Sequence, residues 1–156
     1  VRRILEPGAT ALAASHIDAA ALANLEKTLI RMQESASDLE ELVRHDADFH
    51  AQIAAASGNQ TLASMLNGIS SRTFRARVWR GALDTEAITR TLVEHERILE
   101  ALRGADPELA HAAALAHVCT TEASMRRILA ERPLPPAKPR AVASRAGAPR
   151  AVPKRK

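Results

Sequence analysis

The residues of this sequence that could do chemistry are polar side chains at positions where an amphipathic helix would carry apolar ones. Asp46 and His50 are four residues apart, so they lie one turn apart on a helical face that otherwise carries Leu, Val, Phe and Ile. His95 and His117 interrupt the apolar stripes of two later segments in the same way. We therefore expect four polar side chains to face the interior of the folded chain: Asp46, His50, His95 and His117.

Each of these four polar groups would need a partner inside a protein. Burying an unpaired polar group costs about 1–3 kcal/mol, and burying a carboxylate costs more. One shared divalent ion would satisfy all four groups, and three imidazoles with one carboxylate suit a transition metal such as zinc, nickel, iron or manganese. A His–Asp network held only by hydrogen bonds would explain the same stripes, so both interpretations remain open at this point.

The other three histidines occupy different positions. His45 shares a helical face with Glu41 and Gln52, and His111 lies about 100° from the apolar stripe of its segment. His16 lies in the connection ahead of the second expected helix. We expect none of these three histidines to join the buried set.

The segments that must position these residues have the composition and the end signals of helices. Alanine and leucine dominate, and aromatic residues make up 2% of the chain, which favours helices over strands. Helix ends are marked by a capping box at 37–40, by Gly58 and by Asp84. We expect an all-α antiparallel bundle with short connections. The expected helices cover residues 2–14, 18–35, 37–57, 59–80, 84–104 and 106–130.

The distribution of charge divides the chain into two parts. Residues 133–156 hold seven basic residues and no acidic one, among prolines and alanines that show no periodicity. We interpret residues 1–131 as one folded domain and residues 132–156 as a disordered basic tail. The pI near 10 is then a property of the tail and does not indicate that the folded part binds nucleic acid.

Several classes of protein are disfavoured by the sequence. Cys119 is the only cysteine, so one chain can build neither a disulfide framework nor a cysteine-based zinc site. No apolar run approaches 18 residues and the start shows no signal-peptide pattern, so we expect a cytoplasmic protein without membrane contact. The chain begins with Val-Arg-Arg rather than Met, and we expect it to be a piece of a longer protein.

Four segments resemble the FCD (FadR C-terminal) domain, the ligand-binding domain of many GntR-type bacterial transcription regulators. The family's start is similar to Arg2–Pro7 followed by Leu12–Ala14, and its central motif is similar to Asp46–His50 followed by Ser57–Asn59. A Glu-His-x-x-Ile-Leu-x-Ala segment is matched at residues 94–101, and Gly104, Asp106, Ala110 and His117 fit its last helix. The resemblance covers about residues 2–130.

This resemblance implies a fold, a metal site and a function. FCD domains are bundles of six or seven helices that usually dimerise and hold a metal ion on one Asp and three His. Carried over, the metal ligands are Asp46, His50, His95 and His117. A small organic acid binds beside the metal and controls DNA binding by an N-terminal winged helix-turn-helix. Nothing in this chain resembles that winged domain, so we expect DNA contact only through a part outside it.

Arginines are the candidates for binding a carboxylate effector, because the guanidinium fork can bind both oxygens. Helical angles place Arg72 and Arg77 at the edges of an apolar stripe, and Arg72 corresponds best to an arginine common in the family. Arg2 lies near the inward edge of the first expected helix. We expect Arg2, Arg72 and Arg77 to contribute to the effector site.

A metal-dependent hydrolase is the alternative function, since three His and a carboxylate can leave positions for water and substrate. We expect a regulator and not an enzyme, because the inward stripes carry no further acid or base to move protons.

Overall fold

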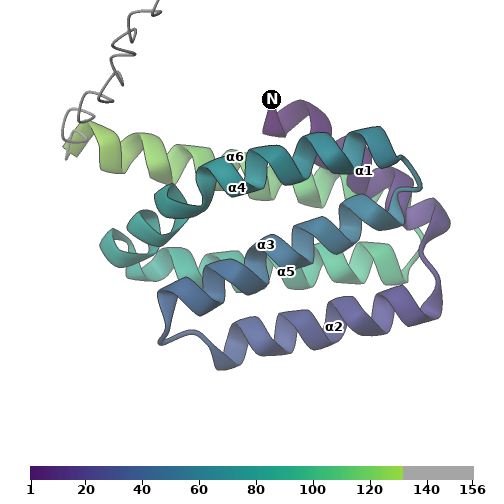
Figure 1. Cartoon of the computed structure of the whole chain (residues 1–156), viewed down its shortest axis with the longest axis horizontal. Coiled ribbons are helices and arrows are strands. Elements are labelled where there is room, and N and C mark those ends of the chain that lie inside the picture. Colours follow the sequence, from purple (N-terminus) through teal and green to yellow (C-terminus); the bar gives the residue numbers. More distant parts are fainter. Residues whose placement is uncertain (132–156) are drawn as a thin grey trace, which may run out of the picture.

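The computed structural model of the protein describes residues 1–131, and these residues form six α-helices without a strand. Successive helices run in opposite directions and make the expected antiparallel bundle (Figure 1). Among the described residues, no helix is long and apolar enough to cross a membrane. The helices are α1 (Arg2–His16), α2 (Ala19–Glu34), α3 (Leu39–Ala56), α4 (Gln60–Leu83), α5 (Thr85–Arg103) and α6 (Pro107–Glu131).

Five of the six helices build the main core. Phe49 of α3, Met32 of α2 and Ile98 of α5 are almost fully buried there, and α1 and α6 pack against them mainly through alanines. Small residues let helices approach closely, which explains how a chain with two Phe and one Trp still forms a dense interior. In Figure 1, α3 and α4 lie in front of α5 and α6, and α2 runs along one edge.

Helix α4 stands apart from this core. Only Leu66 and Arg77 of its 24 residues are buried, and Leu66 belongs to a separate small cluster with Ala9 and Ala54. Most of α4 therefore covers the bundle without anchoring it by apolar burial. The contacts that hold α4 to the bundle include a buried polar one, described below.

Three helix boundaries differ from those predicted. Helix α1 continues to His16, which was expected in the connection that follows it. The first turn of α3 is capped by Asp38, whose Oδ1 accepts hydrogen bonds from the backbone N–H groups of Glu40 and Glu41, so Ser37 is not the cap. Helix α4 continues through Gly81 to Leu83, and a Cβ at residue 81 would lie 3.1 Å from Cδ2 of Leu39. A glycine therefore serves close packing there and does not end the helix.

Candidate metal centre

Three histidines from three different helices meet inside the bundle. His50 of α3, His95 of α5 and His117 of α6 offer ring nitrogens that all lie within 4.8 Å of one another. His95 is 0% exposed and His117 is 2% exposed. The rings of His95 and His117 have centroids 4.7 Å apart, and those of His50 and His95 are 5.0 Å apart. The histidines that interrupt the apolar stripes are therefore brought together.

Asp46 approaches this cluster from one turn before His50 on α3. Its Oδ1 lies 3.4 Å from Nε2 of His95 and 3.7 Å from Nε2 of His50. The group whose ligand atoms are all within 4.8 Å of one another contains the three histidines and not Asp46. The carboxylate thus borders the histidine cluster on one side.

The ring nitrogens of this cluster are short of hydrogen-bond partners. Within residues 1–131, Nε2 of His50 and both ring nitrogens of His95 are buried without one. Phe49 stacks on His95 with centroids 4.5 Å apart and an interplanar angle of 14°, which holds that ring in place. Buried nitrogens without partners are costly unless a further group, such as a metal ion, binds them.

The protonation states also suit a metal. Burial lowers the pKa of His95 to about 3, and burial together with the neighbouring rings lowers the pKa of His50 well below its usual value. Burial alone would raise the pKa of Asp46, but Arg77 and the histidines reverse this and hold it well below its usual range. At neutral pH His50 and His95 are therefore neutral and Asp46 is ionised, which are the forms that bind metals.

Two of the candidate ligands, His117 and Asp46, are each held in place by a charged side chain from a neighbouring helix. Nδ1 of His117 donates a hydrogen bond of 2.8 Å to Oε2 of Glu94, which leaves Nε2 to face the cluster. Nη1 of Arg77 on α4 donates a hydrogen bond of 2.5 Å to Oδ2 of Asp46, whereas Oδ1 faces the histidines. Such outer contacts fix the orientation of metal ligands in known sites.

Two further carboxylates, those of Glu6 and Glu94, lie at the site. The pattern of apolar stripes did not predict them, and we had expected no further acid there. Glu6 is 8% exposed, and its Oε2 lies 3.9 Å from Nδ1 of His50. Arg2 donates two hydrogen bonds to Glu6, of 2.5 and 3.0 Å. The side chain of Glu94 is 14% exposed. Each of these acids is already paired, Glu6 with Arg2 and Glu94 with His117.

The structure separates the three arginines that were expected to bind an effector. Arg77 is buried beside Asp46, and Arg2 contacts the site through Glu6. Arg72 is exposed on α4 and does not line the pocket beside His50. Arg72 therefore lies outside the pocket, although its position in the sequence corresponds to an arginine common in the family.

The three histidines that were expected outside the buried set lie outside it. Nε2 of His45 is 3.4 Å from a carboxylate oxygen of Glu41 on the same face of α3. His111 and His16 are exposed, and Nδ1 of His16 bonds the carbonyl of Leu12. None of them belongs to the described cluster.

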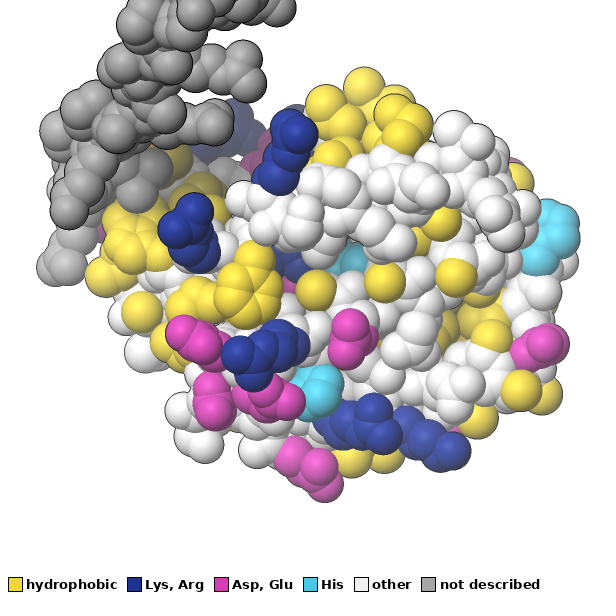
Figure 2. Space-filling model, in the orientation of Figure 1, with side chains coloured by type: hydrophobic (Ala, Val, Ile, Leu, Met, Phe, Trp, Pro, Cys, Tyr) yellow, Lys and Arg dark blue, Asp and Glu magenta, His cyan; other side chains and the backbone are white. Residues whose placement is uncertain are grey.

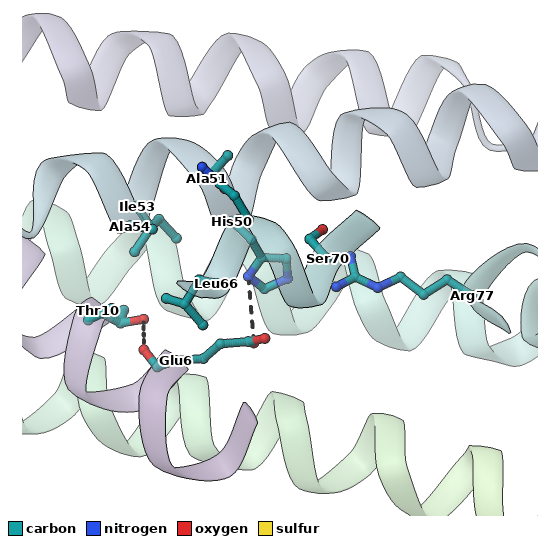
Figure 3. Close-up of a pocket in the computed structure, with 11 residues that line it drawn as sticks. Glu6, Thr10, His50, Ala51, Ile53, Ala54, Leu66, Ser70 and Arg77 are labelled. Carbon is teal, nitrogen blue, oxygen red and sulfur yellow. Dashed lines mark hydrogen bonds and ion pairs between the residues drawn. The ribbon is translucent and has the colours of Figure 1, made fainter. Parts of the chain in front are cut away.

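A small pocket of about 20 Å³, enough for roughly one water molecule, opens beside His50, between α1, α3 and α4. Figure 2 shows histidine and basic side chains set below the surface between α3 and α4. Figure 3 shows Arg77 and Ser70 on one side of the His50 ring and Leu66, Ile53 and Ala54 on the other. A small molecule in this pocket would lie directly against the candidate metal centre.

These features define an all-helical domain with a buried histidine cluster and an adjoining pocket. Residues 1–120 match the family model of the FCD domain. The chain therefore belongs to the FCD domain family, and the resemblance drawn from its sequence motifs is confirmed.

Similar proteins are regulators of the GntR family. The chain is 34% identical over 127 residues to the HTH-type transcriptional regulator LutR of Bacillus subtilis (strain 168), covering 78% of this chain and 58% of that protein. It is 28% identical over 130 residues to the galactonate operon transcriptional repressor of Escherichia coli (strain K12), covering 82% and 56%. The chain thus spans little more than half the length of these relatives.

Solved structures agree with this assignment. Streptococcus agalactiae GntR matches with a TM-score of 0.68 and 28% identity, over 79% of this chain and 55% of that one. E. coli McbR/YncC matches with a TM-score of 0.73 over 81% and 61%, and at 21% identity this likeness concerns the fold alone. The expected helical bundle of the FCD type is confirmed.

Proposed function

We propose that this domain senses a small organic acid for a GntR-type transcription regulator, with a divalent metal ion as part of its binding site. The observation that carries the proposal is the meeting of His50, His95 and His117 from three helices, because buried nitrogens there lack partners among the described residues. A network held only by hydrogen bonds would not leave both nitrogens of His95 unpaired.

The ion would be held by Asp46, His50, His95 and His117, and this donor set favours zinc, with nickel, manganese or iron as alternatives. When bound, the ion would supply a Lewis-acidic centre that attracts carboxylate oxygens. Glu94 would keep the ring of His117 turned toward the ion through the bond to Nδ1. Arg77 would hold one oxygen of Asp46 and leave the other for the ion.

The effector would enter at the pocket beside His50, and the pocket would have to widen to hold it. Arg77 is the cation of that pocket, and its buried Nε has no partner within the described residues. A carboxylate could therefore contact both the ion and this guanidinium. Arg2 would act indirectly, by holding Glu6 in the pocket wall, and Arg72 is left out of the proposal because it is exposed.

DNA binding and dimer formation belong to the same proposal. The two curated relatives are nearly twice as long as the part of them that this chain covers, and both are described as transcription regulators. We infer that DNA is bound by a winged helix-turn-helix outside this chain, in the cytoplasm, and that two copies of this domain pair. Occupancy of the pocket would then change how two DNA-binding domains are spaced.

The test is a thermal-shift screen of small organic acids against zinc-loaded and chelator-treated protein. Hydroxy acids and other carboxylates should raise the melting temperature only in the zinc-loaded sample. Stabilisation by amines or neutral sugars instead, or equal stabilisation by acids without metal, would contradict a metal-assisted carboxylate site.

The hydrolase alternative is tested on the same sample. Glu6 and Glu94 are acids near the cluster, but their bonds to Arg2 and His117 leave neither free to act as a general base. Zinc-loaded protein should therefore show no metal-dependent turnover of a panel of esters, amides and lactones. Such turnover would favour an enzyme over a sensor.

A further inference from the structure

The three histidine rings of the cluster are supported by different neighbours. Nδ1 of His117 is bonded to Glu94, and the ring of His95 is stacked on Phe49. The ring of His50 meets Phe49 only edge-on, with centroids 6.0 Å apart. Stacking therefore does not hold His50 as it holds His95, and another group must determine which of its nitrogens carries the proton.

The carboxylate of Glu6 faces the side of the His50 ring that is turned away from the cluster. Its Oε2 lies 3.9 Å from Nδ1 of His50, whereas Nε2 of the same ring lies 3.7 Å from Asp46 and has no hydrogen-bond partner within residues 1–131. Figure 3 shows the Glu6 side chain extending from α1 toward this ring. A carboxylate beside Nδ1 favours the tautomer with its proton there, which leaves the lone pair of Nε2 for a metal ion.

Arg2 fixes the position of this carboxylate. Arg2 and Glu6 are one turn apart on α1, and the guanidinium donates hydrogen bonds of 2.5 and 3.0 Å to the two carboxylate oxygens. Their side chains are only 13% and 10% exposed, so solvent competes little for the pair. A carboxylate has about four acceptor positions, so Glu6 can accept a further hydrogen bond from the direction of His50.

One water molecule fits between Glu6 and His50. The distance of 3.9 Å is too long for a direct hydrogen bond, and the pocket that both residues line has about 20 Å³, enough for roughly one water. Ser70 lines the same pocket, and its buried hydroxyl oxygen has no partner within the described part of the chain. A water in this pocket therefore has three polar groups to bond, as a buried water requires.

We propose, on the basis of the function proposed above, that Glu6 is a positioning residue of the metal centre, which holds His50 in its Nδ1–H tautomer through a bridging water. Glu6 acts on the ligand and does not contact the ion. The pair of Arg2 and Glu6 thereby brings α1, which supplies no metal ligand, into the metal centre. His50 and His117 are then oriented in the same way, each by a glutamate from a neighbouring helix.

Nitrogen-15 NMR of the histidine rings reads the tautomer directly, and it does so in metal-free protein. At about pH 8, above the ordinary pKa of histidine, the unsubstituted chain should show His50 in the Nδ1–H form. In Glu6→Gln, Arg2 would hold the amide oxygen and leave the amide N–H groups to face His50, so the Nε2–H form should become the major one. The tautomer of His117 should stay unchanged, because its bond to Glu94 is untouched.

Zinc affinity tests whether this tautomer matters to the metal centre. Competition with a chelator of known affinity should show binding about 10–100-fold weaker in Glu6→Gln. Glu122→Gln is the matched control, because Glu122 pairs with Arg3, also in the first turn of α1, at the surface. The double variant Arg2→Met with Glu6→Gln removes both charges of the pair and leaves neither unpaired. It should show the same change of tautomer and the same loss of affinity, even if Glu6→Gln alone unfolds.

The outcomes separate this proposal from the one on which it rests. An unchanged tautomer of His50 in the Glu6 variants would overturn the positioning role and leave the metal centre in place. A changed tautomer with unchanged zinc affinity would overturn it as well, since the tautomer would then be immaterial to the ligand. Failure of the unsubstituted chain to bind zinc would instead overturn the metal centre itself.

Discussion

Glu94 and Arg77 are the side chains through which neighbouring helices act on the candidate metal ligands. Glu94 of α5 bonds a ligand on α6, and Arg77 of α4 bonds a ligand on α3. Neither side chain belongs to the histidine cluster itself. Substitutions at these two positions should therefore change metal binding or stability while leaving all four ligands in the chain.

Glu94→Gln tests the orientation of His117. The neutral amide accepts a weaker hydrogen bond from Nδ1 and no longer favours one tautomer, so we predict that zinc affinity falls about 10–100-fold. Competition with a chelator of known affinity measures the change. Glu100→Gln is the control, because Glu100 is an exposed acid on the same helix. Equal affinities for Glu94→Gln and the unsubstituted chain would show that His117 needs no such support.

Arg77→Met tests the buried ion pair. Both side chains are less than 10% exposed, so removing the guanidinium leaves Asp46 charged and unpaired in the interior. We predict a loss of about 3–5 kcal/mol in the free energy of unfolding of the metal-free protein, measured by chemical denaturation. Arg75→Met, at an exposed position of α4, should have little effect.

Zinc should partly rescue Arg77→Met. The ion provides the positive charge that Asp46 has lost, so its addition should raise the melting temperature of the variant more than that of the unsubstituted chain. A smaller rise in the variant would indicate that Asp46 does not contact the ion.

The pattern of apolar stripes predicted the three clustered histidines because each occupies the centre of a stripe. The stripes did not reveal Glu94, because it immediately precedes His95 and lies at the edge of the inward face. Nor did they reveal the pairing of Arg77 with Asp46, which are 31 positions apart on different helices. Long side chains at the edge of a face reach partners that depend on how helices pack, and helical angles alone do not contain that information.

Helix α4 is the element most able to respond to a ligand. It shares no residue with the main core, and its two buried residues, Leu66 and Arg77, both line the pocket beside His50. A ligand between α3 and α4 would therefore contact the very residues that attach α4 to the bundle. Local stability is low where few apolar contacts are buried, which suits an element that moves on binding.

Asp84 joins the end of α4 to two other helices. Its Oδ1 caps α5, and its Oδ2 accepts hydrogen bonds from Ser124 of α6 at 2.8 Å and from the guanidinium groups of Arg90 and Arg127 at 2.6 and 3.0 Å. Burial would raise the pKa of Asp84, but these donors and charges lower it below its usual value. The charged form is therefore favoured by folding.

Asp84→Asn keeps a residue that can cap α5 and removes the charge. We predict a loss of about 1 kcal/mol at neutral pH, since both arginines are partly exposed. Because folding lowers this pKa, the stabilisation is present above the unfolded pKa and is lost as the pH falls through the folded one. The difference between the two proteins, measured by denaturation across pH 2–7, should shrink below about pH 4. A difference independent of pH would contradict a charge effect.

The number and order of helices could be predicted because caps and breakers are local signals. Gly58 has a φ of 72° just beyond α3, and Asn59 and Asp84 cap the helices that follow, as expected. The end of α4 was misplaced because Gly81 was interpreted as a helix end, whereas it lies inside α4 and packs against Leu39 of α3. Local sequence does not encode that contact between helices. The apolar stripes predict which residues form the main core. They do not predict that α4 contributes no residue to it.

The molecule as a whole combines a family fold with one feature outside that family's pattern. The FCD match ends at residue 120, within α6, and the basic segment predicted to be a disordered tail, residues 132–156, lies outside the described residues. The prediction that this segment is disordered therefore rests only on its composition. The domain limits of 1–131 and 132–156 remain a prediction of the same kind.

Pairing of two domains is tested by sedimentation equilibrium of the purified chain. We predict a dimer, because a sensor of this type transmits ligand binding through the relation between two copies. A monomer at all concentrations, with and without zinc, would contradict the pairing of two copies through this domain.

The metal content of the purified chain tests the central claim most directly. Elemental analysis combined with native mass spectrometry should find about one divalent ion per chain in the zinc-supplied protein, and His50→Ala or His95→Ala should remove it. His45→Ala and His111→Ala should retain it, since neither ring belongs to the cluster. The absence of bound metal from the unsubstituted chain, or equal loss in all four variants, would contradict a metal site at Asp46, His50, His95 and His117.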